Sequence, residues 1–228
     1  MNVLHDGPVP EGLRLEELSN IRAKFIAECD WDSLENAKDS FRKRDIVFHN
    51  CHKSDEVVLW NSFELFDQLH LLQLLDCFAY KQEVSQRLSI IFIDEYLWQA
   101  TSESQLERLG KREPVSEKQL VLGQLSWTAF TAPTPELMLE LMQECTSVLP
   151  FLQNALFRLF EEFPAEWSWL PRTEHCIFRA SMRWNLLARQ FVFCSSSRGT
   201  GPFYGGLVFL ETRAQSRRIS SAFIVIGG

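Results

Sequence analysis

The sequence predicts an α/β fold in which a small parallel sheet is flanked by helices. Residues 55–61 (DEVVLWN) and 87–94 (RLSIIFID) are apolar runs without strict alternation, as is typical of strands buried on both faces. The segment between them, residues 63–80, repeats its leucines at helical spacing. A strand, a helix and a second strand in this order predict a parallel crossover, which is right-handed in nearly all known proteins.

Two helices are predicted before the first strand. Residues 13–29 carry apolar side chains at helical spacing, with acidic residues near the start, where the helix dipole favours negative charge. A second helix is expected over residues 32–52, with Asp32 or Ser33 as its N-terminal cap. Both helices follow the opening loop, which contains the stretch VLHDGPVPEG.

After residue 96 the pattern changes to a helical half of the chain. Residues 116–130 begin with Ser116 in capping-box spacing, and residues 134–145 begin with Thr134 as a cap. A further helix is expected within residues 148–164. Nine side chains of these elements and of the strands are predicted to be buried: Leu59, Trp60, Leu69, Leu72, Ile91, Ile93, Trp127, Phe151 and Leu156.

Charge divides the chain into two parts. Residues 1–165 hold 15 Lys and Arg against 27 Asp and Glu, whereas residues 166–228 hold 8 against 3. We therefore expect an α/β domain with a helical second half over 1–165 and a small basic C-terminal module over 166–228. A helix-turn-helix is one interpretation of residues 170–191, and residues 221–228 are expected to form a strand.

The basic module has two interpretations. Its arginines could contact nucleic acid, with Arg172, Arg183 and Arg198 as candidate anion contacts, or they could dock on the acidic body of the protein. Docking is the favoured interpretation, because the chain as a whole carries a net charge of −7.

Composition is that of a soluble globular protein, with 46% hydrophobic and 23% charged residues. The apolar runs are far shorter than the roughly 20 residues that span a bilayer, so no membrane helix is predicted. No basic leader precedes an apolar stretch at the N-terminus. The six cysteines lie far apart without a CxxC pair, which favours reduced thiols and a cytoplasmic location.

A binding site is predicted at the carboxyl ends of the two strands, where ligands bind in open parallel sheets. Asn61 ends the first strand, and Asp94 and Glu95 end the second. Asp94 could coordinate a metal through water or act as a general base, or it could cap the next turn. The candidate ligand-binding residues are His5, Asp6, Asn61, Glu64, Asp94 and Glu95.

Other motifs are better explained by structural roles than by catalysis or ligand binding. The stretch HNCHKSDE lacks a fourth ligand for zinc, so its histidines are interpreted as helix-end residues and no metal site is predicted. His70 is interpreted as a satisfied, half-buried side chain rather than a catalytic base. The stretch SSSRGTGPFYGG lacks the spacing of a phosphate loop, and no Gly-x-Ser-x-Gly elbow occurs.

Several blocks resemble, in order, a bacterial family known as domain of unknown function 1835. They are LHDGPVPEGLRLEELSNIRAKF, DEVVLWNSFELFDQLHLLQLLD, IDEYL, and LPFLQNALFRLFEEFP with LPRTE. The resemblance runs from about Val3 to Glu174 and weakens through PFYGGLVFLETRAQ. It implies that a strand, a Gly-Asp loop and a helix should precede the segment matching Leu4 to Pro10. Either the start codon is misassigned or the protein is a shortened relative.

The resemblance also implies a weakened site. After the tryptophan that matches Trp60, relatives carry a Glu-His-Asp set, where this chain has Ser62, Phe63 and Glu64. Their Gly-Asp near the C-terminus corresponds here to Gly205 and Gly206. These replacements remove metal ligands and proton carriers but preserve apolar packing.

The function predicted from the sequence is a ligand-binding or regulatory α/β domain with a weakened site. One alternative is a regulatory protein that binds nucleic acid through the basic module. Another is a metal- or nucleotide-dependent enzyme whose N-terminal site loop is missing, and a third is a noncatalytic homologue that acts through protein contacts. The sequence identifies no reaction or cofactor, and the expected partner is a small molecule or a protein, with no membrane.

If the opening loop belongs to this site, its position in the fold is predictable. The segment from Leu4 to Pro10 should lie beside the carboxyl ends of the strands that carry Asn61 and Asp94. His5 or Asp6 would then be within reach of Asp94.

Overall fold

The computed structural model describes residues 3–94, 107–144 and 146–181, together with the backbone of residues 223–226. The protein has the predicted α/β fold. Four strands form one sheet in the order β3-β2-β1-β4. The strands are β1 (Glu56–Ser62), β2 (Leu88–Ile93), β3 (Glu113–Pro114) and β4 (Phe223–Ile226).

The two central strands are parallel, as predicted, with Trp60 opposite Ile91. On either side of them, β4 pairs antiparallel with β1, and the two-residue strand β3 pairs antiparallel with β2. The strand expected near the C-terminus is therefore present and extends the sheet. A strand as short as β3 carries no periodic pattern, so the sequence did not predict it.

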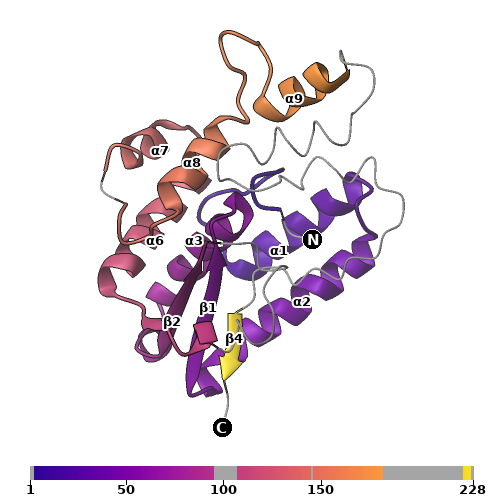
Figure 1. Ribbon diagram of the computed structural model, residues 1–228. Helices are drawn as coiled ribbons and strands as arrows, with labels where there is room; N and C mark the ends of the chain where they lie inside the picture. The colour runs from indigo at the N-terminus through magenta and orange to yellow at the C-terminus, as the bar shows by residue number, and fades with distance from the viewer. Residues whose placement is uncertain (1–2, 95–106, 145, 182–222, 227–228) are drawn as a thin grey trace.

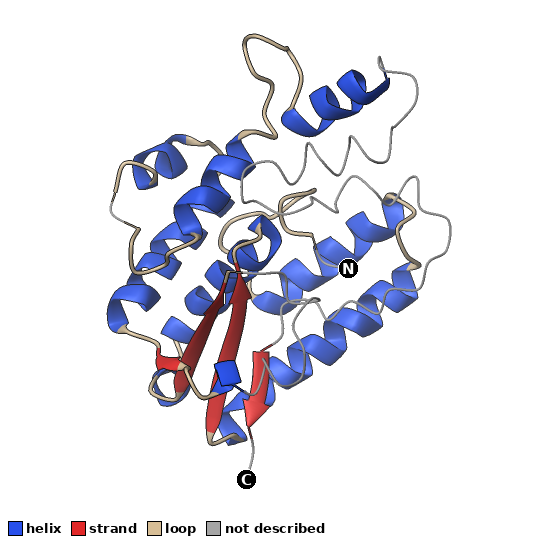
Figure 2. Ribbon diagram, viewed as in Figure 1, coloured by secondary structure: helices blue, strands red, loops and turns tan. Residues whose placement is uncertain are grey.

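The helices follow the predicted order. They are α1 (Leu15–Glu28), α2 (Leu34–Asn50), α3 (Leu65–Ala79), α4 (Gln82–Ser85), α6 (Glu117–Thr131), α7 (Glu136–Leu141), α8 (Leu152–Phe160) and α9 (Arg172–Ser181), with a 3-10 turn, η1 (Cys51–Lys53), after α2. Figures 1 and 2 show α3 behind the sheet, α6 to α8 on one side of it, and α1 and α2 on the other. Within the described residues, no helix is both long and apolar enough to cross a membrane.

Capping residues explain where several helices begin. Ser33 accepts a 3.1 Å hydrogen bond from the backbone N–H of Asn36 at the start of α2, and Ser116 forms the predicted capping box of α6 with Gln119. The predicted cap of α7 is wrong by one residue. The cap is Pro135, and the Thr134 side chain is hydrogen-bonded to Glu136 instead.

The core lies between the sheet and the helices. Val57 and Leu59 of β1 form one buried cluster with apolar residues of α3, α6 and α8. On the opposite face of the sheet, Val58, Trp60, Ile91 and Ile93 form a separate buried cluster. Adjacent residues of both strands are buried, so these strands are covered on both faces, as the apolar runs without alternation predicted.

The predicted core is confirmed except at two aromatic side chains. Trp127 and Phe151 are only half-buried. Trp127 packs beside Phe130 of its own helix, and Phe151 precedes α8, where its ring meets Phe63 and Phe92 edge to face. Rings of this size reach the core from its margin, and part of each then stays exposed.

Candidate functional site

The opening loop is held by a buried arginine of α1. The guanidinium of Arg22 is fully buried and donates hydrogen bonds to the carbonyl oxygens of Val3 at 2.6 Å and Asp6 at 2.5 Å, with Pro8 at 3.5 Å. Figure 1 shows this loop at the carboxyl end of β1 and β2, the end at which the sequence predicted it. The clamp thus reaches the loop through its backbone oxygens.

Close packing underneath the loop requires a glycine. Gly7 has a φ of +78°, and a Cβ at this position would lie 2.5 Å from the ring of Phe25. The guanidinium of Arg22 lies over the same ring, with Cζ 5.0 Å from its centroid. The backbone position of the loop is therefore fixed from two sides.

The loop brings His5 beside helices α1, α3 and α8. Burial lowers the pKa of His5 to about 3, and the charges of Arg158, His70 and Arg22 act in the same direction. The imidazole is thus neutral at physiological pH. Asp6 is half-buried, and burial raises its pKa while Arg22 opposes and Glu162 adds to this effect.

His70 lies on α3 and is buried. Its Nδ1 is 2.9 Å from the carbonyl oxygen of Phe66, so this nitrogen donates the hydrogen bond, and the ring meets the Phe66 ring edge to face. Burial lowers the pKa of His70 to about 3, and Arg44 contributes to the decrease. The interpretation of His70 as a satisfied side chain agrees with these contacts, although it is more deeply buried than expected.

A buried polar network joins the end of β1 to the start of α3. Asn61 donates a 3.1 Å hydrogen bond to the carbonyl oxygen of Asp67 and accepts one from Gln68. The Ser62 hydroxyl donates to the Asp67 carboxylate at 2.5 Å. Burial raises the pKa of Asp67, and the hydrogen bonds from Ser62 oppose that rise. Asn61, a predicted ligand contact, is therefore engaged in holding the turn between strand and helix.

The other predicted site residues are distributed differently. Glu64 is the N-cap residue of α3, where its backbone N–H donates to the Ser62 hydroxyl at 3.3 Å. Asp94 directly follows β2 and is exposed to solvent. Glu95 lies outside the described residues. His5 and Asp6 both lie within the electrostatic influence of Arg22 on α1, and no contact of either residue with Asp94 is found among the described residues.

A second buried arginine, Arg158, lies near the end of α8. Its side chain is only 4% exposed and forms an ion pair with Glu162 in the turn that follows the helix. Thr173 of α9 joins both groups, because its hydroxyl donates to the Glu162 carboxylate at 2.8 Å and lies 3.4 Å from Arg158 Nη2. This arrangement connects α8, the following turn and α9.

Of the three arginines predicted to contact an anion, one lies within the described residues. Arg172 is ion-paired with Glu161 at 2.5 Å, and its side chain is 16% exposed. Arg183 and Arg198 lie outside the described residues. The one described arginine of the three is therefore occupied by a carboxylate of the same protein.

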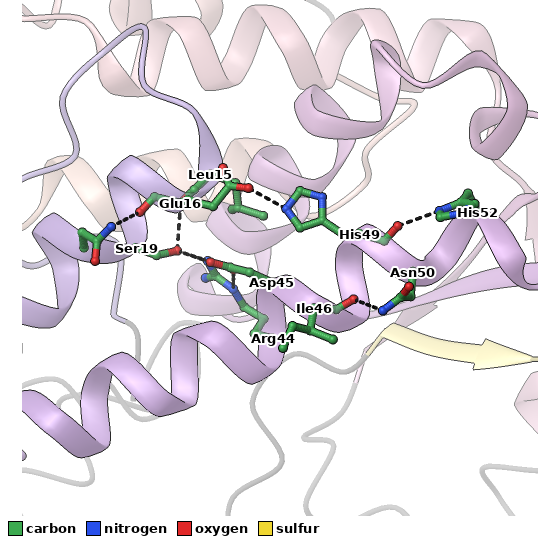
Figure 3. A network of polar contacts seen from close by, with 10 residues as sticks. Leu15, Glu16, Ser19, Arg44, Asp45, Ile46, His49, Asn50 and His52 are labelled. Atoms are coloured by element: carbon green, nitrogen blue, oxygen red, sulfur yellow. Dashed lines mark hydrogen bonds and ion pairs between the residues drawn. The ribbon is translucent and has the colours of Figure 1, made fainter.

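Helices α1 and α2 are joined by another polar network (Figure 3). Ser19 Oγ lies 2.8 Å from the buried Asp45 carboxylate, and Arg44 donates to both. His49 Nε2 is 2.7 Å from Glu16 Oε1, and His52 Nδ1 is 2.7 Å from the carbonyl oxygen of His49. His49 and His52 thus make helix-end contacts, and no group of three or more potential metal ligands is found within the described residues.

The sequence analysis did not identify Arg22, Arg158 and Glu162. Arg22 falls between the buried residues Leu18 and Ile26 on α1, and Arg158 falls between Leu156 and Leu159 on α8. A charged residue on the apolar face of a helix is the signal that could have found them, because such a charge must be paired when it is buried.

These observations describe an α/β protein whose opening loop lies at the carboxyl end of the parallel strands (Figure 1) and is held there by the buried Arg22. Burial and the charges of Arg158, His70 and Arg22 all act to lower the pKa of His5 in this loop. Comparison of the sequence with protein-family models and with curated proteins finds no match, and neither does comparison with solved structures.

Proposed function

We propose that this protein is a ligand-binding regulatory domain that takes a small molecule beneath its opening loop. The observation that carries the proposal is the opening loop, which Arg22 holds at the carboxyl end of the parallel strands (Figure 1) by the carbonyl oxygens on either side of His5. Burying ionisable groups together is unfavourable for folding alone, and perturbed groups near the end of a parallel sheet are typical of binding sites. The family resemblance of the sequence adds no ligand, because that family is uncharacterised.

The site is proposed to be weakened relative to an enzyme. Asn61 and Asp67 are committed to the strand-to-helix turn, and each has hydrogen-bond partners within the protein. His70 uses Nδ1 to bind the Phe66 carbonyl oxygen. These internal hydrogen bonds favour the binding of a small molecule over a metal- or nucleotide-dependent reaction. Nucleic-acid binding gains no support from Arg172, whose guanidinium is ion-paired with Glu161.

Thermal unfolding with a panel of small molecules tests the proposal. The panel contains ATP, AMP, adenosine, inorganic phosphate, succinate, Mg²⁺ and Mn²⁺. A ligand present at 100 times its Kd adds about 2.7 kcal/mol of stability, which corresponds to a rise in Tm of roughly 5–10 °C for a chain of this size.

A matched pair of histidine variants assigns the response to the site. His5→Asn should reduce the ligand-induced rise in Tm, because His5 is the histidine of the opening loop. His52→Asn should leave the rise unchanged, because His52 is exposed in the 3-10 turn η1 that follows α2. A flat response from well-folded protein to the whole panel would rule out the proposed function.

Two further proposals accompany the function. We propose that the chain is a divergent member of the family known as domain of unknown function 1835, which the order of the matching blocks supports. We also propose a cytoplasmic location, which is supported by free thiols at the described cysteines Cys29, Cys51, Cys77 and Cys176. The proposed partner is a small molecule, with a protein as the alternative.

A further inference from the structure

The ion pair between Arg158 and Glu162 has one fixed and one movable member. Arg158 lies on the buried face of α8 with 4% of its side chain exposed, among Ala155, Leu156 and Leu159. Glu162 lies beyond the last residue of α8, and 23% of its side chain is exposed. Solvent can therefore receive the carboxylate of Glu162, whereas the guanidinium of Arg158 must keep an anionic partner where it is.

The opening loop lies next to this ion pair. The charge of Arg158 acts on His5, and the charge of Glu162 acts on Asp6. Arg22 is occupied by the loop's carbonyl oxygens, so it positions the loop rather than offering a free guanidinium. The second buried arginine, Arg158, has the partly exposed Glu162 as its partner, and the Thr173 hydroxyl lies 3.4 Å from its Nη2.

We propose that the ligand of this site carries a phosphate or carboxylate group, and that this group replaces the Glu162 carboxylate on Arg158. The inference rests on the proposed function, because it specifies the chemistry of the same ligand. Glu162 thereby acts as an internal competitor that occupies the site in the absence of ligand.

The chemistry of Arg158 favours this exchange. A guanidinium presents a planar set of N–H donors that matches both carboxylate and phosphate oxygens. Replacing one anion by another keeps the buried charge of Arg158 compensated throughout, which avoids the large penalty of an unpaired buried charge. The Thr173 hydroxyl already donates to the Glu162 carboxylate, and it can donate to the incoming anion in the same way.

A purely structural role for the pair makes a different prediction. If Arg158 and Glu162 only fasten α8 to the following turn and to α9, neutralising Glu162 lowers stability and leaves anion binding unchanged. If Glu162 is a competitor, neutralising it tightens anion binding. The two interpretations are distinguished by affinity rather than by stability.

Isothermal titration calorimetry of the whole chain measures this affinity. The probes are inorganic phosphate and succinate at constant ionic strength, and the proteins are wild type, Glu162→Gln and Glu161→Gln. Glu162→Gln should bind the preferred anion about fivefold more tightly, the factor that corresponds to removing a partly exposed ion pair. Glu161→Gln removes the adjacent carboxylate, which is 2.5 Å from Arg172 but 4.0 Å from Arg158, and should change the affinity by less than twofold.

The double variant Arg158→Lys with Glu162→Gln should lose this gain, because lysine keeps the charge without the planar donors. If the double variant fails to fold by circular dichroism, the contrast between Glu162→Gln and Glu161→Gln decides the question alone. The probe that binds distinguishes a phosphate from a carboxylate ligand.

Two negative outcomes are distinguishable. Equal anion affinity in wild type and Glu162→Gln, with a rise in Tm on adding uncharged adenosine, would overturn the anionic ligand and leave the proposed function standing. No response of any variant to phosphate, succinate or the rest of the panel would overturn both.

Discussion

The guanidinium of Arg22 donates a 2.6 Å hydrogen bond to the carbonyl oxygen of Val3, which fixes the start of the opening loop against α1. A second bond, to the carbonyl oxygen of Asp6, fixes the loop three residues further on. Between these two points lies His5, whose pKa is lowered by burial and by charges on α3 and α8. A single buried side chain thus fixes the position of the opening loop.

Arg22→Met should destabilise the protein by about 2–4 kcal/mol, because it leaves buried carbonyl oxygens without their donor. Urea denaturation followed by circular dichroism measures the change. The matched control is Arg42→Met on α2, whose guanidinium pairs with Asp39 at the surface and which should change stability by less than about 0.5 kcal/mol. Equal effects of the two substitutions would mean that the Arg22 contacts do not stabilise the fold.

The sequence predicted the main strands and helices because these elements are long. Strands β1 and β2 and helices α1, α3 and α6 are long enough for periodicity and caps to define them, and the predicted bounds differ from the observed ones by one or two residues. The short elements α4 and β3 were missed because four or two residues carry no period. Local patterns therefore identify long elements and their order.

The candidate site was only partly predictable. His5 and Asp6 were singled out by the opening stretch VLHDGPVPEG. The rule for parallel sheets then predicted that this loop lies at the carboxyl end of the strands, where Figure 1 shows it. It could not predict that Asn61 would form hydrogen bonds with Asp67 and Gln68. These partners depend on the geometry of the turn between β1 and α3 and on the side-chain rotamers there. The charge of Arg158 acts on His5 across a sequence separation of about 150 residues, and no local pattern encodes such a long-range effect.

Acidification should destabilise the protein below pH 6.5. In the unfolded chain His5 and His70 have the ordinary pKa of about 6.5, whereas burial lowers the pKa of both to about 3 in the folded protein. Between these values the unfolded state binds more protons, so the free energy of unfolding falls by up to about 1.4 kcal/mol per pH unit for each histidine. Above pH 6.5 this contribution to stability is fully present.

Urea denaturation at pH 7.5 and pH 5.0 measures this dependence in wild type and in His70→Gln. The variant should lose less stability on acidification than wild type. The raised pKa of Asp67 acts in the opposite direction, but it is present in both proteins and cancels in the difference. Parallel pH profiles for the two proteins would contradict the assignment of a neutral, buried His70.

Truncation of the core should be costly on both faces of the sheet. Leu72 of α3 is 1% exposed in the main core, and Ile91 of β2 is 5% exposed in the cluster on the opposite face. Leu72→Ala and Ile91→Ala should each destabilise the protein by about 2–5 kcal/mol. Chemical denaturation measures both, and losses under about 1 kcal/mol would mean that these side chains do not lie in the core.

Gly123→Ala tests the packing of α6 on α3. Alanine favours a helix over glycine by about 1 kcal/mol, so at an open position this substitution would stabilise α6. At Gly123, however, a Cβ would lie 2.4 Å from Cβ of Leu75, and Leu75 is itself completely buried. The helices must separate or the backbone must shift to admit the methyl group, which should lower the free energy of unfolding by about 1–3 kcal/mol.

We therefore expect net destabilisation by Gly123→Ala despite the gain in helix propensity. Thr128→Ala, at an exposed position of the same helix, is the control and should change stability by less than about 0.5 kcal/mol. Thermal unfolding followed by circular dichroism compares the two variants with wild type. An increase in Tm for Gly123→Ala would show that α6 and α3 are further apart than the contact of Gly123 with Leu75 requires.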